Sequence, residues 1–482
     1  MSITKLAPFI LCFCISNSCA QRVEIVKEYY SPEELKEDFA VFRTSLEEGH
    51  PALYRYKSRP ALDSIFAFTE ASISKQMSDR EFTQLLSKLA AQIGDGHLRV
   101  ILPKTHKDKL DEGPTALPFR MYYYEGKLFI TKNLSELPDK EIVGAEIISI
   151  NGHSMEEFLK EYFSMVASDG NNLTNKYRML QRPRFFPRYF NILYGYTEEY
   201  EIVVMPLGET VPKTFKFRGI TIDQLIKIQE KRNPLNTLAS FNLSANKDYA
   251  YMAITSFDKS ALKENNINFE DFVEKSFRRL SVDKINNLIL DLRGNGGGTD
   301  EYGKILFSYF TNQSFIYYES VRINKESFNF FKYTSRPDMR VPKGMVKANN
   351  LGTFDNIKHP NVGIQKPSQP TYTGNIYVLI DGSCFSTTSE FLSMLHFHTK
   401  AVFIGEESGG GYYGNSSGAT PEFTLPNTKV SIEIPLMNYA MAVKGYSFPD
   451  RGIIPDHTII PSVEDKIENR DIVLEFATSL KK

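Results

Sequence analysis

Residues 288–298 read LILDLRGNGGG, and this stretch decides the fold. Leu288 to Leu292 form an apolar run with the length of a buried strand, and a glycine run follows it directly before a helical pattern at 300–310. Backbone N–H groups exposed in succession at the start of a helix form a nest that stabilises an anion. No Lys-Ser or Lys-Thr pair follows, so an oxyanion hole fits better than a nucleotide loop. A simple tight turn is the alternative.

Strand-like and helical patterns alternate around this stretch. The segments that carry them are 249–255, 269–280, 375–380, 387–396 and 401–405. Such alternation is typical of an α/β sheet whose functional loops follow the carboxyl ends of its strands. Residues 311–370 are polar and weakly periodic, so we expect an insertion or a long loop that borders the site.

The residues before this sheet divide into two blocks of different character. Capping boxes at 31–34 and 78–81 begin two amphipathic helices, which predicts a helical domain over residues 21–105. Residues 106–225 hold strand-like runs and an Asn-Gly turn, which indicates a small β domain with one or two helices. At roughly 100–200 residues per domain, the length fits three domains, and the last covers 226–482.

The composition excludes several classes of protein. Lys and Arg number 57 and Asp and Glu number 58, so the chain lacks the basic field of a nucleic-acid binder. Its 41% hydrophobic and 24% charged residues exclude a mostly disordered chain. No run approaches the roughly 18 apolar residues of a membrane span. His396 and His398 fall on different faces of a predicted helix, and we expect neither a metal nor a cofactor.

The first twenty residues are typical of a signal peptide. Lys5 supplies the positive charge, residues 6–15 form the apolar segment, and small residues precede a cut before Gln21. A short buried helix is one alternative, and a lipoprotein cut before Cys19, which would carry a lipid anchor, is another. We expect an exported protein, periplasmic or extracellular. Only Cys384 remains after a cut before Gln21, so no disulfide could form within the chain.

A second loop carries candidate nucleophiles. Residues 381–390, DGSCFSTTSE, join a predicted strand to a predicted helix. Ser386 lies at the start of that helix, where the helix dipole favours negative charge and assists a nucleophile. The same position suits an ordinary N-cap serine. Cys384 is a rival nucleophile, although a lone buried cysteine is usually inert packing.

Together and in this order, these features resemble peptidase family S41, the C-terminal processing (tail-specific) serine peptidases. The segments that carry the resemblance are HPALY at 50–54, DGH at 95–97, GAEIISING at 144–152, DLRGNGGG at 291–298, FSTTSEF at 385–391, GEESGGG at 405–411 and GIIPD at 452–456. The resemblance implies an α/β multidomain chain. Its parts would be a helical N-terminal domain, a PDZ-like domain at 106–225 and a C-terminal α/β core of the ClpP/crotonase kind.

Two catalytic schemes exist in that superfamily. One is a Ser–Lys dyad, which needs a lysine after the GEESGGG segment, but none lies between Lys400 and Lys429. The resemblance therefore implies the tricorn-like branch, in which a histidine from the N-terminal part is the base. It places the nucleophile at Ser386 and the base at His97. Thr387 stays open as a rival, because the family's Ser-x-x-Glu spacing is shifted here.

The remaining roles follow from the same resemblance. The N–H groups of Gly296 or Gly297 and of Thr387 would bind the oxyanion. Asp450 is the candidate for a third catalytic member, and the acid position stays open. The implied function is an exported serine endopeptidase that cleaves peptide or protein substrates through an acyl-enzyme on Ser386. A catalytically silent peptide-binding scaffold is the main alternative, and an esterase is another.

Overall fold

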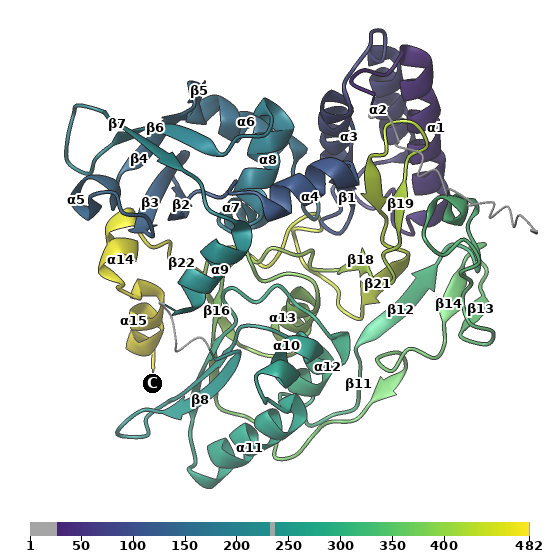
Figure 1. Ribbon diagram of the computed structural model, residues 1–482. Coiled ribbons are helices and arrows are strands. Elements are labelled where there is room, and N and C mark those ends of the chain that lie inside the picture. Colours follow the sequence, from purple (N-terminus) through teal and green to yellow (C-terminus); the bar gives the residue numbers. More distant parts are fainter. Residues whose placement is uncertain (1–26, 232–236, 482) are drawn as a thin grey trace, which may run out of the picture.

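The computed structural model describes residues 27–231 and 237–481, apart from the side chains of 229–231. The predicted signal peptide, with both predicted cut sites, lies outside the described residues. The fold is mixed α/β, as predicted, with many helices and several separate sheets (Figure 1). Among the described helices, none has the length and apolar character needed to cross a bilayer.

A six-stranded sheet forms the centre of the C-terminal half. Its strands are β8 (Ala239–Leu243), β9 (Ala250–Ile254), β10 (Asn287–Asp291), β16 (Asn375–Ile380), β17 (Val402–Gly405) and β22 (His457–Thr458). They lie in the order β22-β17-β16-β10-β9-β8, and only the β8–β9 pair is antiparallel. Parallel strands place their carboxyl ends at one edge, so the loops after β10, β16 and β17 lie together.

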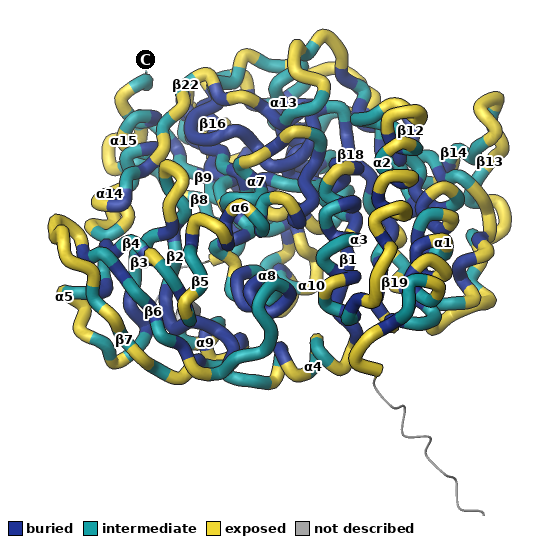
Figure 2. The backbone as a smooth tube through the Cα atoms, turned by 90° about the horizontal axis from the view of Figure 1, so that it is seen from above, coloured by how far each residue is buried: buried dark blue, intermediate teal, exposed yellow. Residues whose placement is uncertain are grey.

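Helices cover both faces of this sheet. They are α10 (Lys259–Glu264), α11 (Phe269–Val282), α12 (Asp300–Phe307), α13 (Thr387–His398) and α15 (Ile472–Ser479), and a further short helix, α14 (Val463–Glu468), precedes α15 in the chain. Leu288 and Leu290 pack into the core with α11, α12 and α13, whereas Ile289 packs with residues of α15. Burial on both faces explains why β10 reads as one continuous apolar run. The tube through β16 and the first nine residues of α13 is accordingly mostly dark blue in Figure 2.

The N-terminal block is helical, with one short strand. Its elements are α1 (Pro32–Gly49), α2 (Arg59–Ser72), α3 (Asp79–Ile93), β1 (Arg99–Ile101) and α4 (Lys104–Glu112). Both predicted capping boxes are present, at Ser31 with Glu34 and at Ser78 with Glu81. Gly94 ends α3 in the left-handed conformation, with φ +79°, and turns the chain into the loop that carries His97.

The next block is built on a second sheet, with the strand order β2-β3-β4-β6-β7. Its strands are β2 (Phe119–Tyr124), β3 (Lys127–Asn133), β4 (Glu146–Ile150), β5 (His153–Ser154), β6 (Glu199–Met205) and β7 (Lys213–Arg218). Its helices are α5 (Asp139–Ile142), α6 (Met155–Met165), α7 (Thr174–Leu180), α8 (Phe185–Tyr194) and α9 (Ile222–Lys231). The predicted Asn151-Gly152 turn has positive φ at both residues and joins β4 to β5.

Of the two alternatives for residues 311–370, an insertion or a long loop, the long loop is wrong. This segment forms β11 (Phe315–Ile316), β12 (Tyr318–Ile323), η1 (Asn329–Tyr333), β13 (Val346–Ala348), β14 (Phe354–Asn356) and β15 (Ile364–Gln365). Strands β12, β13 and β14 join β18 (Gly414–Ser417) and β21 (Met437–Met441) in a five-stranded sheet. Strand β20 (Ser431–Glu433) pairs with β1 on one side and with β19 (Glu422–Thr424) on the other. Most of these strands have two or three residues, which is too few to show an alternating pattern.

Candidate active site

Ser386 occupies the junction between β16 and α13. It is the N-cap residue of α13, yet its side chain makes no capping hydrogen bond. Its Oγ instead lies 3.2 Å from Nε2 of His97, which comes from a loop 289 residues earlier. The backbone of Ser386 has φ 57° and ψ −129°, an unfavourable conformation for a residue with a Cβ, and such strain is characteristic of functional sites. The simple N-cap interpretation therefore does not describe this serine.

The side chains of the two rival nucleophiles, Cys384 and Thr387, are directed at backbone carbonyl oxygens. The buried Sγ of Cys384 lies 3.1 Å from the carbonyl oxygen of Leu292, and burial raises the pKa of the thiol. The buried Thr387 donates its hydroxyl to the carbonyl oxygen of Gly298 at 3.0 Å. Within this segment, Ser386 is thus the residue whose hydroxyl faces a histidine.

The His97 ring is held against the nucleophile loop. It stacks on the ring of Phe385, with centroids 4.6 Å apart and planes at 28°. The preceding Gly96 leaves room for this stack, because a Cβ there would lie 2.7 Å from Cζ of Phe385. Burial lowers the pKa of His97 to about 4 and outweighs the opposite effect of Asp95. The imidazole is therefore neutral at pH 7 and able to accept a proton.

Asp95 stabilises the loop that carries His97. Its Oδ1 accepts the backbone N–H of His97 at 2.8 Å, and its Oδ2 lies 3.1 Å from Nε2 of His50. Nδ1 of His50 accepts the N–H of Ala52, so the His50 proton resides on the nitrogen that faces Asp95. Burial alone would raise the pKa of Asp95, but His50 and His97 outweigh it and lower that pKa. Asp95 is thus a carboxylate at neutral pH.

Asp169 is a site residue that sequence reasoning missed. Its Oδ1 accepts the N–H of Gly96 at 2.9 Å, and its Oδ2 accepts the N–H of Gly411 at 3.0 Å. It therefore joins the His97 loop to the GEESGGG loop that follows β17. Burial, reinforced by the charge of Asp95, raises the pKa of Asp169 to about 6. An Asp-Gly pair before α7 reads as an ordinary turn, and no local signal in the sequence distinguishes it.

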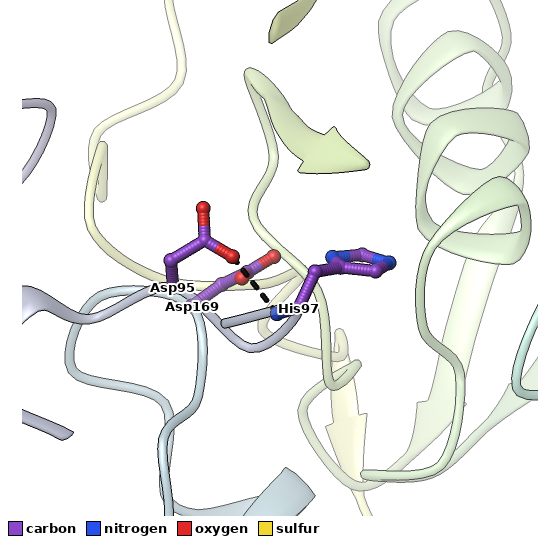
Figure 3. A group of neighbouring side chains, drawn as sticks. All are labelled: Asp95, His97 and Asp169. Carbon is purple, nitrogen blue, oxygen red and sulfur yellow. Dashed lines mark hydrogen bonds between the residues drawn. The ribbon is translucent and has the colours of Figure 1, made fainter. Parts of the chain in front are cut away.

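Asp95, His97 and Asp169 form one cluster (Figure 3). Each offers one possible ligand atom, all within 4.8 Å of one another, so among the described residues these three could together hold a metal ion. The carboxylates of Asp95 and Asp169 already accept the backbone N–H groups named above. This arrangement fits a role in which the two acids hold the loops around the His97 imidazole by hydrogen bonds. Nδ1 of His97 is buried and has no hydrogen-bond partner among the described residues. His396 is not a member of this cluster, and its Nδ1 lies 3.0 Å from the Tyr412 hydroxyl.

Asp450, the predicted third member, is directed elsewhere. Its carboxylate accepts a hydrogen bond from the Asn171 side chain, and its carbonyl oxygen accepts the Asn171 N–H at 2.9 Å. The neighbouring Gly170 donates its N–H to the carbonyl oxygen of Gly94 at 2.9 Å. The loop that carries Asp169 is therefore bonded to the Asp450 loop on one side and to the His97 loop on the other. The geometry gives no support to a pairing of Asp450 with His97.

The predicted oxyanion donors divide into two groups. The N–H of Gly297 is engaged, because it donates to Oδ1 of Asn295 at 2.9 Å. The N–H groups of Gly296 and Thr387 have no hydrogen-bond partner among the described residues. A Cβ at Gly297, which has φ +95°, would lie 2.8 Å from Cβ of Ser386. Gly297 thus allows the glycine loop to approach Ser386. The two free N–H groups belong to Gly296, which precedes Gly297, and to Thr387, which follows Ser386.

The whole fold is similar to that of mature CPAF. The crystal structure of mature CPAF matches with a TM-score of 0.61 at 13% sequence identity, covering 94% of this chain and 97% of that one. Mature CPAF complexed with lactacystin matches with a TM-score of 0.62 at 13% identity, covering 94% and 98%. At this identity the likeness establishes a shared fold. Among curated proteins, none matches the sequence.

The family assignment comes from a different comparison. Residues 248–459 match the family model described as Peptidase family S41. The matched range contains the glycine loop, Ser386 and the GEESGGG segment, whereas His97 and Asp169 lie outside it. The chain therefore carries a domain of peptidase family S41 and is a serine-type peptidase.

Proposed function

We propose that this peptidase is an endopeptidase in which Ser386 is the nucleophile and His97 the general base. Oγ of Ser386 attacks the peptide carbonyl while Nε2 of His97 takes the hydroxyl proton. His97 then returns that proton to the leaving amine as the carbon–nitrogen bond breaks. Water, deprotonated by the same imidazole, hydrolyses the ester on Ser386. The observation that carries the proposal is the 3.2 Å approach of His97 Nε2 to an Oγ that does not cap its helix.

We assign the binding of the oxyanion to the free backbone N–H groups of Thr387 and Gly296. The N–H of Thr387 lies at the start of α13, where the helix dipole adds to its positive charge. The N–H of Gly296 is exposed in the glycine loop and would supply the second hydrogen bond. Such donors act most strongly on the charge that develops in the transition state, and the loss of one typically costs roughly 10²–10³ in rate.

We assign peptide binding to the block at 106–225, as a PDZ-like domain. Its antiparallel sheet ends in β2 on one side and β7 on the other, and an edge strand can accept an extended peptide by strand addition. Export to the periplasm or the extracellular space is supported by the pattern of the first twenty residues, with a lipid anchor at Cys19 as the alternative.

The proposal is tested by labelling with a serine-directed fluorophosphonate. We expect one equivalent of label on Ser386, located by mass spectrometry of the digested protein. Ser383→Ala is the matched control, since it removes a serine from the same loop, and it should keep the label. Label on Thr387 or Cys384 would reassign the nucleophile. A folded protein that takes no label would favour the catalytically silent scaffold, and label with cleavage of esters but not peptides would favour the esterase.

The pH dependence of labelling distinguishes a buried from an ordinary histidine. Because burial lowers the pKa of His97 to about 4, the base should be lost only as the pH falls through that value. At pH 5 the labelling rate should therefore remain at about nine-tenths of its value at pH 7, whereas an ordinary histidine with a pKa of about 6.5 would leave a few per cent. A midpoint near 6.5 would contradict the prediction. A step near pH 6 that disappears in Asp169→Asn would belong to Asp169.

A further inference from the structure

Arg182 lies beside the glycine loop without an acidic partner. It occupies the turn between α7 and α8, and its backbone is fixed by the hydrogen bonds of that turn. Its Nη2 lies 3.3 Å from the position that a Cβ at Gly296 would take. Its side chain makes no hydrogen bond or ion pair with any described residue. The two arginines nearest in sequence differ, since Arg178 pairs with Glu406 and Arg184 lies 3.2 Å from Asp111.

This guanidinium is close to the reacting atoms. Gly296 carries one of the two free N–H groups, and the next residue, Gly297, approaches the Cβ of Ser386. Both Arg182 and Gly296 are exposed, so a peptide bound at Ser386 can reach them. A cation beside Gly296 is therefore placed to meet a substrate next to the bond that is cleaved.

A second arginine, Arg99, lies two residues after His97 in the chain. Burial lowers the pKa of both His97 and Arg182, and the positive charge of Arg99 lowers both pKa values further. Its side chain is 55% exposed, and its Nη1 lies 3.5 Å from Oε2 of Glu433, a loose pairing. The acid whose charge reaches Arg182 is Asp381, but Oδ1 of Asp381 accepts backbone N–H groups of its own loop and of the glycine loop. Arg182 thus has no ion-pair partner among the described residues, and the acid that Arg99 approaches is Glu433, at 3.5 Å.

We propose that Arg182, assisted by Arg99, forms a subsite for a carboxylate of the substrate next to the scissile bond. The inference rests on the proposed function of Ser386 and adds the substrate class to it. An arginine binds a carboxylate through two parallel N–H···O bonds, which fixes position as well as supplying attraction. The carboxylate can come from an aspartate or glutamate side chain or from a free C-terminus, and these two sources share the chemistry.

The test is a cleavage assay on a defined library of N-acetylated peptides. One arm has amidated C-termini and varies Glu against Gln at each position, and the other keeps neutral side chains and compares a free with an amidated C-terminus. We expect the protein to prefer the carboxylate in one arm by about tenfold in kcat/KM. The arm that shows the preference identifies the source. The preference should weaken with added salt.

Substitutions connect the preference to the residue. Arg182→Gln should bring the ratio close to one, and Arg182→Glu should reverse it in favour of lysine at the same position. Arg184→Gln is the matched control and should keep the preference. If the protein has no preference, or if Arg182→Glu keeps it, the subsite is refuted. Fluorophosphonate labelling of Ser386 is measured in the same samples. Because the reagent carries no carboxylate, labelling that persists without a carboxylate preference would refute the subsite alone, whereas absence of labelling would refute the proposed function.

Discussion

Replacement of Ser386 by alanine should reduce kcat by roughly 10⁶-fold, to a rate indistinguishable from background in most assays. The Oγ of Ser386 is the group that the His97 ring faces, and the neighbouring hydroxyl and thiol are bound to backbone carbonyls. Neither Cys384 nor Thr387 is therefore placed to take over the attack. The measurement is peptide cleavage with purified protein, together with a thermal melt that shows the variant to be folded.

The same kinetics test whether Ser386 and His97 act as one unit. His97→Ala should lose nearly as much activity as Ser386→Ala, and the double variant should be no slower than either single variant, because each removes the same step. Ser383→Ala should retain full activity. Loss of activity that multiplied in the double variant would mean that the two residues act in separate steps and would refute the proposed pair.

The sequence predicts the two loops of the site that join a strand to a helix. The glycine loop after β10 and the Ser386 loop after β16 each follow an apolar run, and parallel strands bring such loops to one edge. The core strands and the two capping boxes follow from the same local patterns. His97 was placed by family resemblance, since a histidine at the end of a helix has no chemical signature of its own.

Asp169 shows what local patterns cannot provide. Its partners, Gly96 and Gly411, are 73 and 242 residues away in the chain, and both offer only backbone N–H groups. Because both partners are glycines, the residue type at neither position indicates a contact with an acid. Asp450 illustrates the complementary case: its position in the sequence suggests an acid near the site, whereas its carboxylate and its carbonyl both bond to Asn171. The pairing of acids with a histidine is a tertiary property.

The second prediction with a large effect concerns Gly297. A Cβ added there would lie 2.7 Å from the carbonyl oxygen of Phe385 and 2.8 Å from Cβ of Ser386. Both distances are shorter than van der Waals contact allows, and the Phe385 oxygen, like the Thr387 nitrogen at 3.0 Å, belongs to the backbone of the nucleophile loop. Gly297→Ala should therefore displace Ser386 from His97, and a displacement of about 1 Å costs on the order of 10²-fold in rate.

Gly294→Ala is the control that isolates this effect from backbone strain. Gly294 lies in the same loop with φ +80°, against φ +95° at Gly297, so alanine costs each protein about 1–2 kcal/mol of conformational energy. A Cβ at Gly294 meets nothing within 4 Å. We expect both variants to melt earlier, but only Gly297→Ala to lose kcat/KM and fluorophosphonate labelling. Equal activity in the two variants would show that the contact between the glycine loop and Ser386 does not set the geometry of the nucleophile.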